Sequence, residues 1–202
     1  RKYRLLLINP FSKYKRHDFH DVHALSPPLA LGIIAALTPP NWEVEILDEN
    51  FEIFSFRQAD LVGLTAMTAS VNRAYELAGV FRARGIATVI GGIHASMIPE
   101  EAGAFVDSVV TGEAESVWPE LIRDFEQAAL KARYDGKLLP MTGAIVPRRD
   151  LFHPSYTYAN IQTTRGCPMK CDFCSVHTFN GSHYRERPVE EVLGELETIP
   201  HQ

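Results

Sequence analysis

The sequence predicts an α/β fold in which a five-stranded, doubly wound parallel sheet occupies the first 130 residues. Short apolar runs alternate with stretches of helical periodicity, as expected for a parallel sheet covered by helices on both faces. Proline, serine and glycine stand where the helices should begin and end. The 202 residues are 46% hydrophobic and 22% charged, which is the composition of an ordinary globular protein.

The expected strands are short apolar runs, each followed by polar or small residues. They span residues 4–8, 44–47, 61–65, 88–90 and 108–110. Alternation of this kind fits a sheet of the flavodoxin-like or Rossmann-like type, which binds ligands beyond the carboxyl ends of its strands.

The expected helices lie between these strands and have recognisable ends. The first opens at Pro27 and Pro28, and the second begins after Ser70 and ends at Gly85. A shorter helix is expected from Pro99 to about residue 105. A last one is expected from about residue 116, with an apolar face turned toward the sheet.

A break in the pattern divides the chain into three parts: 1–130, a linker at 131–157, and 158–202. The linker contains five glycines and prolines and shows little periodicity. A new unit then begins with an expected strand at 158–163, a loop, and a helix opened by Pro188. Because the chain does not begin with methionine, we expect it to be a piece of a longer protein.

All three cysteines of the chain, Cys167, Cys171 and Cys174, lie within eight residues at C-x3-C-x2-C spacing. An odd number argues against a disulfide framework and for thiolates that bind metal. Three thiolates could hold three irons of a 4Fe–4S cluster and leave the fourth iron open. A structural zinc site with His177 as fourth ligand, and three thiols without a metal, are the alternatives.

Candidate ligand-binding residues follow the expected strands. They are Asn9, then Thr65, Met67 and Thr68, then Gly91, Gly92 and His94, and finally Gly112 and Glu113. Glycines let the backbone approach a bulky ligand, and small hydroxyl side chains supply hydrogen bonds. The residues alone leave a second interpretation open, in which the glycines form tight turns and the threonines cap helices.

The run CPMKCDFC, preceded by TTRG, resembles the signature of the radical S-adenosylmethionine (SAM) superfamily. The resemblance implies that Cys167, Cys171 and Cys174 bind a 4Fe–4S cluster whose open iron chelates SAM. It also implies that Phe173 lies beside the SAM adenine, and that residues 158–202 are the first βα unit of a truncated barrel. We therefore expect this chain alone not to cleave SAM.

The segments GLTAMT, VIGGIHAS and VTGEAE resemble the cobalamin-binding domain of cobalamin-dependent radical SAM enzymes. The resemblance implies that Thr65, Met67 and Thr68 line a channel for the nucleotide tail of cobalamin. It implies that Gly91, Gly92 and His94 contact the tail or its ribose, and that Gly112 and Glu113 close the pocket. Asn9 is expected to bind cobalamin as well.

Many cobalamin proteins carry a D-x-H-x-x-G motif whose histidine binds cobalt. Here the corresponding loop reads DFHDVH, with His23 where glycine belongs. We therefore expect His17, His20 and His23 to be loop or surface residues.

The resemblance implies methyl transfer from SAM through methylcobalamin to an unactivated carbon or phosphorus centre, by way of a 5′-deoxyadenosyl radical. Cyclisation, oxidation or ring contraction with the same cofactors is the first alternative, and a non-catalytic cobalamin-binding module is the second. The expected partners are a small-molecule substrate and a reductant such as flavodoxin or ferredoxin. A net charge of −5 gives no sign of a nucleic-acid surface. No run approaches the roughly 18 apolar residues of a membrane span, and we expect a cytoplasmic protein.

Overall fold

Six parallel strands form one sheet in the order β2-β1-β3-β4-β5-β6. The structure is a computed structural model that describes residues 2–11 and 26–199. The strands are β1 (Tyr3–Asn9), β2 (Trp42–Asp48), β3 (Leu61–Thr65), β4 (Ala87–Gly91), β5 (Ser108–Thr111) and β6 (Arg133–Asp135). The prediction of a parallel α/β sheet is confirmed. The strand order reverses between β1 and β3, because β2 pairs with one side of β1 and β3 with the other.

The predicted number of five strands is wrong, because β6 pairs with β5 at the sheet edge. This strand lies at the start of the segment expected to be a linker. It has only three residues, and only Tyr134 among them is buried. A short edge strand with polar neighbours leaves no apolar run in the sequence, which is why the pattern did not reveal it.

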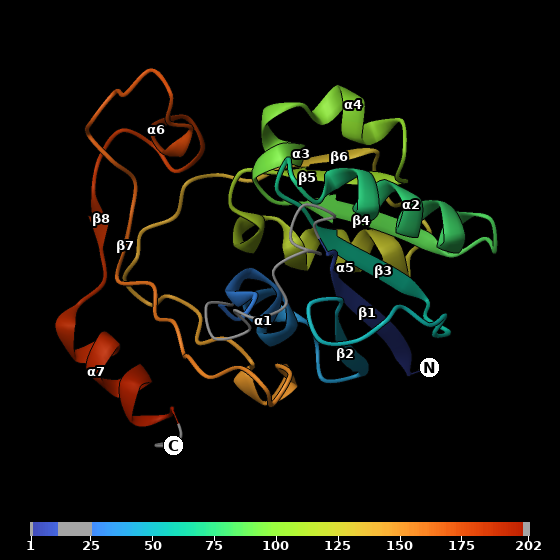
Figure 1. Cartoon of the computed structure of the whole chain (residues 1–202), viewed down its shortest axis with the longest axis horizontal. Coiled ribbons are helices and arrows are strands. Elements are labelled where there is room, and N and C mark those ends of the chain that lie inside the picture. Colours follow the sequence, from blue (N-terminus) through green and yellow to red (C-terminus); the bar gives the residue numbers. More distant parts are fainter. Residues whose placement is uncertain (1, 12–25, 200–202) are drawn as a thin grey trace.

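Helices cover both faces of the sheet, and the chain thus forms three layers (Figure 1). The α-helices of this part are α1 (Leu29–Leu37), α2 (Val71–Arg82), α3 (Ile93–Met97), α4 (Pro99–Gly103) and α5 (Trp118–Glu126). A 3-10 turn, η3 (Ala114–Ser116), precedes α5. The sequence predicted every one of these α-helices except α3, which is too short to show a periodicity and lacks an opening proline such as Pro99 of α4.

Two apolar cores lie on opposite faces of the sheet. In one, Leu6, Val62 and Ile90 pack against α2, where Phe81 is fully buried. In the other, Leu7 and Val89 pack against α1 and α5. Alternate residues of a strand point to opposite faces, so the continuous buried run of β1 supplies both cores.

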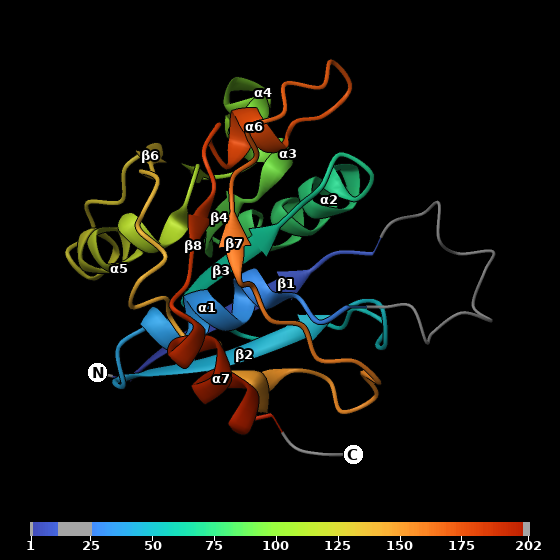
Figure 2. The same cartoon turned by 90° about the vertical axis from the view of Figure 1, so that its left-hand side faces the viewer.

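The rest of the chain runs beside the sheet as an extended segment (Figure 1). Its elements are the 3-10 turn η4 (Arg149–Leu151), β7 (Thr164–Arg165), α6 (Val176–Phe179), β8 (Arg185–Glu186) and α7 (Val189–Glu197). Figure 2 shows β7 and β8 side by side, with α6 beyond one end of the pair and α7 beyond the other.

The strand expected at 158–163 is not formed, and the expectation is corrected in two respects. The observed strand is β7, which is shorter and lies later, and it pairs with β8 in the antiparallel direction. A parallel barrel strand needs a parallel neighbour, and the described residues place none beside 158–163. The helix opened by Pro188 is confirmed as α7. In the described part of the chain, every helix is too short or too polar to cross a bilayer.

Candidate functional site

A trough of small residues crosses the carboxyl half of the sheet on the face that α1 and α5 cover. The strand register places Gly63 between Leu7 and Val89, and it places Thr65 beside Gly91. A Cβ added at Gly91 would find its nearest neighbour at an ordinary contact distance of 3.7 Å, whereas one at Gly63 would meet the Leu7 side chain at 2.7 Å. Residues two apart on a strand share a face, so Gly63, Thr65 and Gly91 all lie on this face. The Leu7 side chain covers Gly63, whereas Gly91 leaves open space above the floor.

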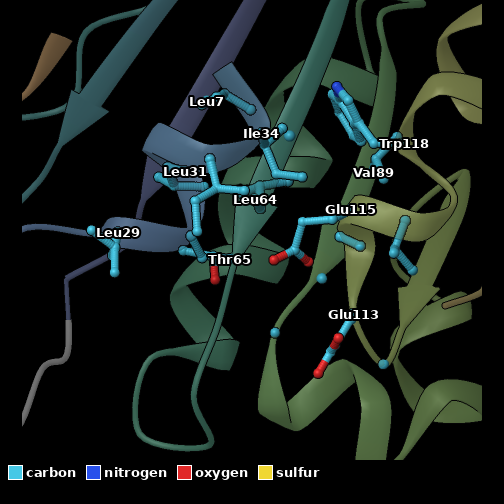
Figure 3. A pocket seen from close by; sticks show the side chains of 18 of the residues that line it. Leu7, Leu29, Leu31, Ile34, Leu64, Thr65, Val89, Glu113, Glu115 and Trp118 are labelled. Atoms are coloured by element: carbon cyan, nitrogen blue, oxygen red, sulfur yellow. The ribbon is translucent and has the colours of Figure 1, made fainter. Parts of the chain in front are cut away.

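A cavity of about 220 Å³ lies over this floor. Apolar side chains, including Ile34 of α1 and Trp118 of α5, surround one end, and the carboxylates of Glu113 and Glu115 lie toward the other (Figure 3). Four lining residues come from the segment that carries the cysteines: Gln162, Arg165, Phe179 and Asn180. The cavity therefore has walls from both parts of the chain, and it suits a slender organic group with a polar end.

Two glycines allow tight turns where β4 and β5 end. Gly92 has φ +98° and Gly112 has φ +63°, a region that other residues rarely adopt. A Cβ at Gly92 would lie 2.9 Å from the carbonyl oxygen of Ala66, and one at Gly112 would lie 2.4 Å from that of Gly136. These contacts support the turn interpretation, and both glycines also line the cavity.

Glu113 lies at the centre of a buried charge cluster at the polar end of the cavity. Its side chain is only 3% exposed, and it pairs with Arg165 at 3.2 Å and with Arg185 at 3.0 Å. Its Oε2 also accepts the backbone N–H of Leu139 at 2.7 Å. Burial raises the pKa of this carboxyl group, but the hydrogen bonds from Arg185 and Leu139 and the two positive charges outweigh that effect and hold the pKa below its ordinary value of 4.5. Glu113 is therefore an anion at neutral pH.

His94 and Thr68 lie on the other side of the sheet, away from the cavity. His94 is buried, with Nδ1 3.2 Å from the Thr68 hydroxyl and Nε2 3.2 Å from the Glu101 carboxylate. Tyr75 also donates to Glu101, and burial raises the pKa of its hydroxyl group. The geometry gives His94 a full set of partners within the protein. A contact of His94, Thr68 or the exposed Met67 with a ligand stays a prediction.

Asn9 belongs to a third group, at the carboxyl ends of β1 and β2. Its amide donates to buried Asp48 at 3.0 Å, and the hydroxyl of Tyr156 donates to the same carboxylate. Asn50 donates to Asp48 through its backbone and its side chain. This network anchors the segment before the cysteines to the sheet. His17, His20 and His23 lie outside the described residues.

The cysteines occupy a loop that β7 and β8 close at its base. Cys167 donates its N–H to Gly181 at 3.0 Å, and Cys174 donates its N–H to Cys171 at 3.0 Å. All three thiols are free and partly buried. Among the described residues, no three histidine, cysteine or acidic side chains converge in the arrangement of a metal site. Thiolates are nevertheless the ligands that iron–sulfur clusters take, and binding of a cluster by Cys167, Cys171 and Cys174 stays a prediction.

Phe173 is 93% exposed on this loop and is not among the residues that line the cavity over the sheet. The Nδ1 atom of His177 is buried and has no hydrogen-bond partner. The roles that the sequence suggested for these two residues stay predictions.

The structure thus brings together at the cavity five of the residues expected near a ligand: Thr65, Gly91, Gly92, Gly112 and Glu113. Sequence reasoning missed Arg165 and Arg185, although two arginines that flank the cysteine loop are a usable signal. It also missed the wall that α1 and Trp118 provide. That wall depends on packing between distant segments, which one sequence alone does not reveal.

Comparison with protein families gives one match that covers half of the chain. Residues 19–122 match the B12 binding domain family. The match contains β2 to β5, α1 to α4 and the floor of the cavity.

Among curated relatives, two from Chlorobaculum tepidum share high similarity with this chain. The bacteriochlorophyllide d C-8(2)-methyltransferase is 40% identical over 183 residues, which are 84% of this chain and 40% of the relative. The bacteriochlorophyllide d C-12(1)-methyltransferase is 33% identical over 95% of this chain and 44% of the relative. The hopanoid C-2 methylase of Rhodopseudomonas palustris is 27% identical over 89% of this chain and 36% of the relative. The chain spans less than half the length of these relatives.

Proposed function

The chain belongs to the B12 binding domain family and to the cobalamin-dependent radical SAM proteins, and we therefore propose that the whole protein is a methyltransferase. It would transfer a methyl group from SAM to an unactivated carbon centre of a small molecule. The observation that carries the proposal is the shared cavity, whose floor is the glycine trough and whose far wall belongs to the cysteine segment.

In this proposal the trough holds the nucleotide tail of cobalamin. Gly91 leaves the floor open. Ile34 and Trp118 supply an apolar wall, and Thr65 offers a hydroxyl group near the strand ends. Parallel sheets bind ligands at this edge because backbone ends and loops converge there. The residues therefore fit the group that the family binds.

The cysteine loop would hold the second cofactor through Cys167, Cys171 and Cys174. When bound, the cluster with SAM would supply a radical that removes hydrogen from the substrate, and cobalamin would carry the methyl group. The chain's own part is to fix both sites and to keep water from the space between them. A reductant such as flavodoxin or ferredoxin would provide the electrons. In this proposal the cobalamin-binding domain would end after β6. Residues 158–202 would form the beginning of the radical SAM domain.

The substrate class to test first is a chlorin with an alkyl side chain, because two relatives act on bacteriochlorophyllide d. The full-length protein would be incubated without oxygen with methyl-labelled SAM, a reductant, hydroxocobalamin and such a chlorin. We expect 5′-deoxyadenosine and a product that carries the label.

The other outcomes separate the alternatives. Deoxyadenosine with an altered but unlabelled product would favour cyclisation, oxidation or ring contraction. Bound cobalamin without any deoxyadenosine would favour a non-catalytic binding module. A labelled product from another acceptor, with no label in the chlorin, would support methyl transfer and exclude the chlorin as the substrate.

A further inference from the structure

The base of the cysteine loop places two positive charges directly opposite each other. Arg165 of β7 and Arg185 of β8 are partners in the antiparallel register. Like charges at opposed positions destabilise a pair of strands. The backbone at the base is also tight, because a Cβ at Gly166 would lie 2.0 Å from the carbonyl oxygen of His183. The loop base therefore needs an anion from elsewhere in the protein.

The sheet supplies that anion from the wall of the cavity. Glu113 pairs with both arginines, and Glu115 pairs with Arg165. We call Glu113, Glu115, Arg165 and Arg185 the Glu113 cluster. All four side chains are at most 17% exposed, so each pair is largely removed from water. Removing one member would leave an uncompensated charge in this place.

Arg185 connects three segments through this cluster. It donates to Glu113 at the end of β5, to the carbonyl oxygen of Leu139 before the cysteine segment, and to that of Asn180 in the cysteine loop. Asn180 and Arg165 also line the cavity, as do Gly112, Glu113 and Glu115. One set of contacts therefore fixes the shape of the polar end of the cavity and the position of the loop.

We infer that the Glu113 cluster positions the cysteine loop over the cofactor cavity and couples the two sites, so that a group bound in the cavity orders the loop. This inference rests on the proposed function, since it takes the nucleotide tail of cobalamin as the occupant. An occupant that touches both walls stabilises their docked arrangement, and the coupling must be reciprocal. Glu113 and Arg185 are thus positioning residues, which act through the loop.

The test is hydrogen exchange of backbone amides in residues 164–186, with and without saturating cyanocobalamin. Binding is checked separately by optical titration. In the unaltered protein we expect cyanocobalamin to slow exchange in this segment roughly tenfold, within the usual range of coupling between two sites. In Glu113→Gln we expect the slowing to fall below about twofold while cyanocobalamin still saturates the protein.

Two further variants make the test specific. Arg185→Gln removes the partner on the loop side and should give the same loss, which keeps the inference testable if Glu113→Gln does not fold. Glu49→Gln is the matched control, because Glu49 is a buried carboxylate that pairs with Arg73 at 2.6 Å and accepts the N–H of Phe11, away from the loop. We expect Glu49→Gln to retain the full slowing.

The possible results separate this inference from the proposed function. If the unaltered protein binds cyanocobalamin and the exchange of residues 164–186 does not change, the coupling is refuted and the cofactor assignment stands. The same holds if Glu113→Gln and Arg185→Gln keep the full slowing. If the unaltered protein does not bind cyanocobalamin, the proposed function fails, and the inference fails with it.

Discussion

Filling the trough with one side chain should weaken cofactor binding without harm to the fold. Gly91→Val is the change of choice, because Gly91 lies at the end of β4 on the cavity floor. An added Cβ would find its nearest neighbours, backbone and side-chain atoms of Val110, at 3.7 and 3.8 Å. These are ordinary contacts. Gly91 also lacks the positive φ of its neighbour Gly92, so valine suits the strand.

The magnitude follows from the cavity's size and lining. A valine displaces about three carbon-sized groups of the occupant, and each buried group of that size contributes ~0.8 kcal/mol. The loss is thus about 2.4 kcal/mol, or a factor of about 60 in the dissociation constant. The free energy of unfolding should change little. Glycine loses more backbone freedom on folding than valine does, so its replacement gains about 0.5–1 kcal/mol, which offsets the cost of minor repacking.

The assay is optical titration of the protein with cobalamin, together with urea unfolding of each variant. Gly79→Val is the matched control, since Gly79 lies on α2 with no atom within 4 Å of an added Cβ. We expect it to bind like the unaltered protein. A Gly91→Val protein that folds and binds cobalamin with unchanged affinity would refute the placement of the cofactor in the trough.

Three further predictions concern charge, anchoring and metal. The pKa of Glu113 is lowered on folding, so its contribution to stability is complete above about pH 4.5 and is lost as the pH falls through the lower folded value; unfolding of Glu113→Gln between pH 7 and 3 should lack this component, and an identical profile would contradict the assignment. Tyr156→Phe removes a donor from buried Asp48 and should cost about 1–3 kcal/mol in urea unfolding; unchanged stability would show that the hydrogen bond contributes nothing. Cys174→Ala should lose the visible absorbance and the iron of the reconstituted cluster, whereas full iron retention would exclude Cys174 as a ligand.

Local sequence signals were sufficient for most of the sheet. Buried parallel strands leave continuous apolar runs, and helices between them carry end signals such as the prolines before α1 and Gly85 after α2. The elements β6, α3, β7 and β8 escaped detection because they are short and have neither a continuous apolar run nor an opening proline such as Pro99 of α4. Their formation depends on neighbours that are distant in the chain, as the pairing of β7 with β8 shows.

The parts of the candidate site that carry a local sequence motif could be predicted. The cysteine spacing and the glycines at the strand ends identified the loop and the cavity floor. The Glu113 cluster was not predictable, because Glu113 and Arg185 lie 72 residues apart. Their pairing follows from the docking of the extended segment on the sheet, and a single sequence does not contain that information.

A crystal structure of the protein with bound cobalamin would test the central claim most directly. We predict electron density for the nucleotide tail in the cavity, in contact with Gly91 and walled by Ile34 and Trp118. Density for the cofactor at any other place on the protein, with the trough empty, would contradict the account.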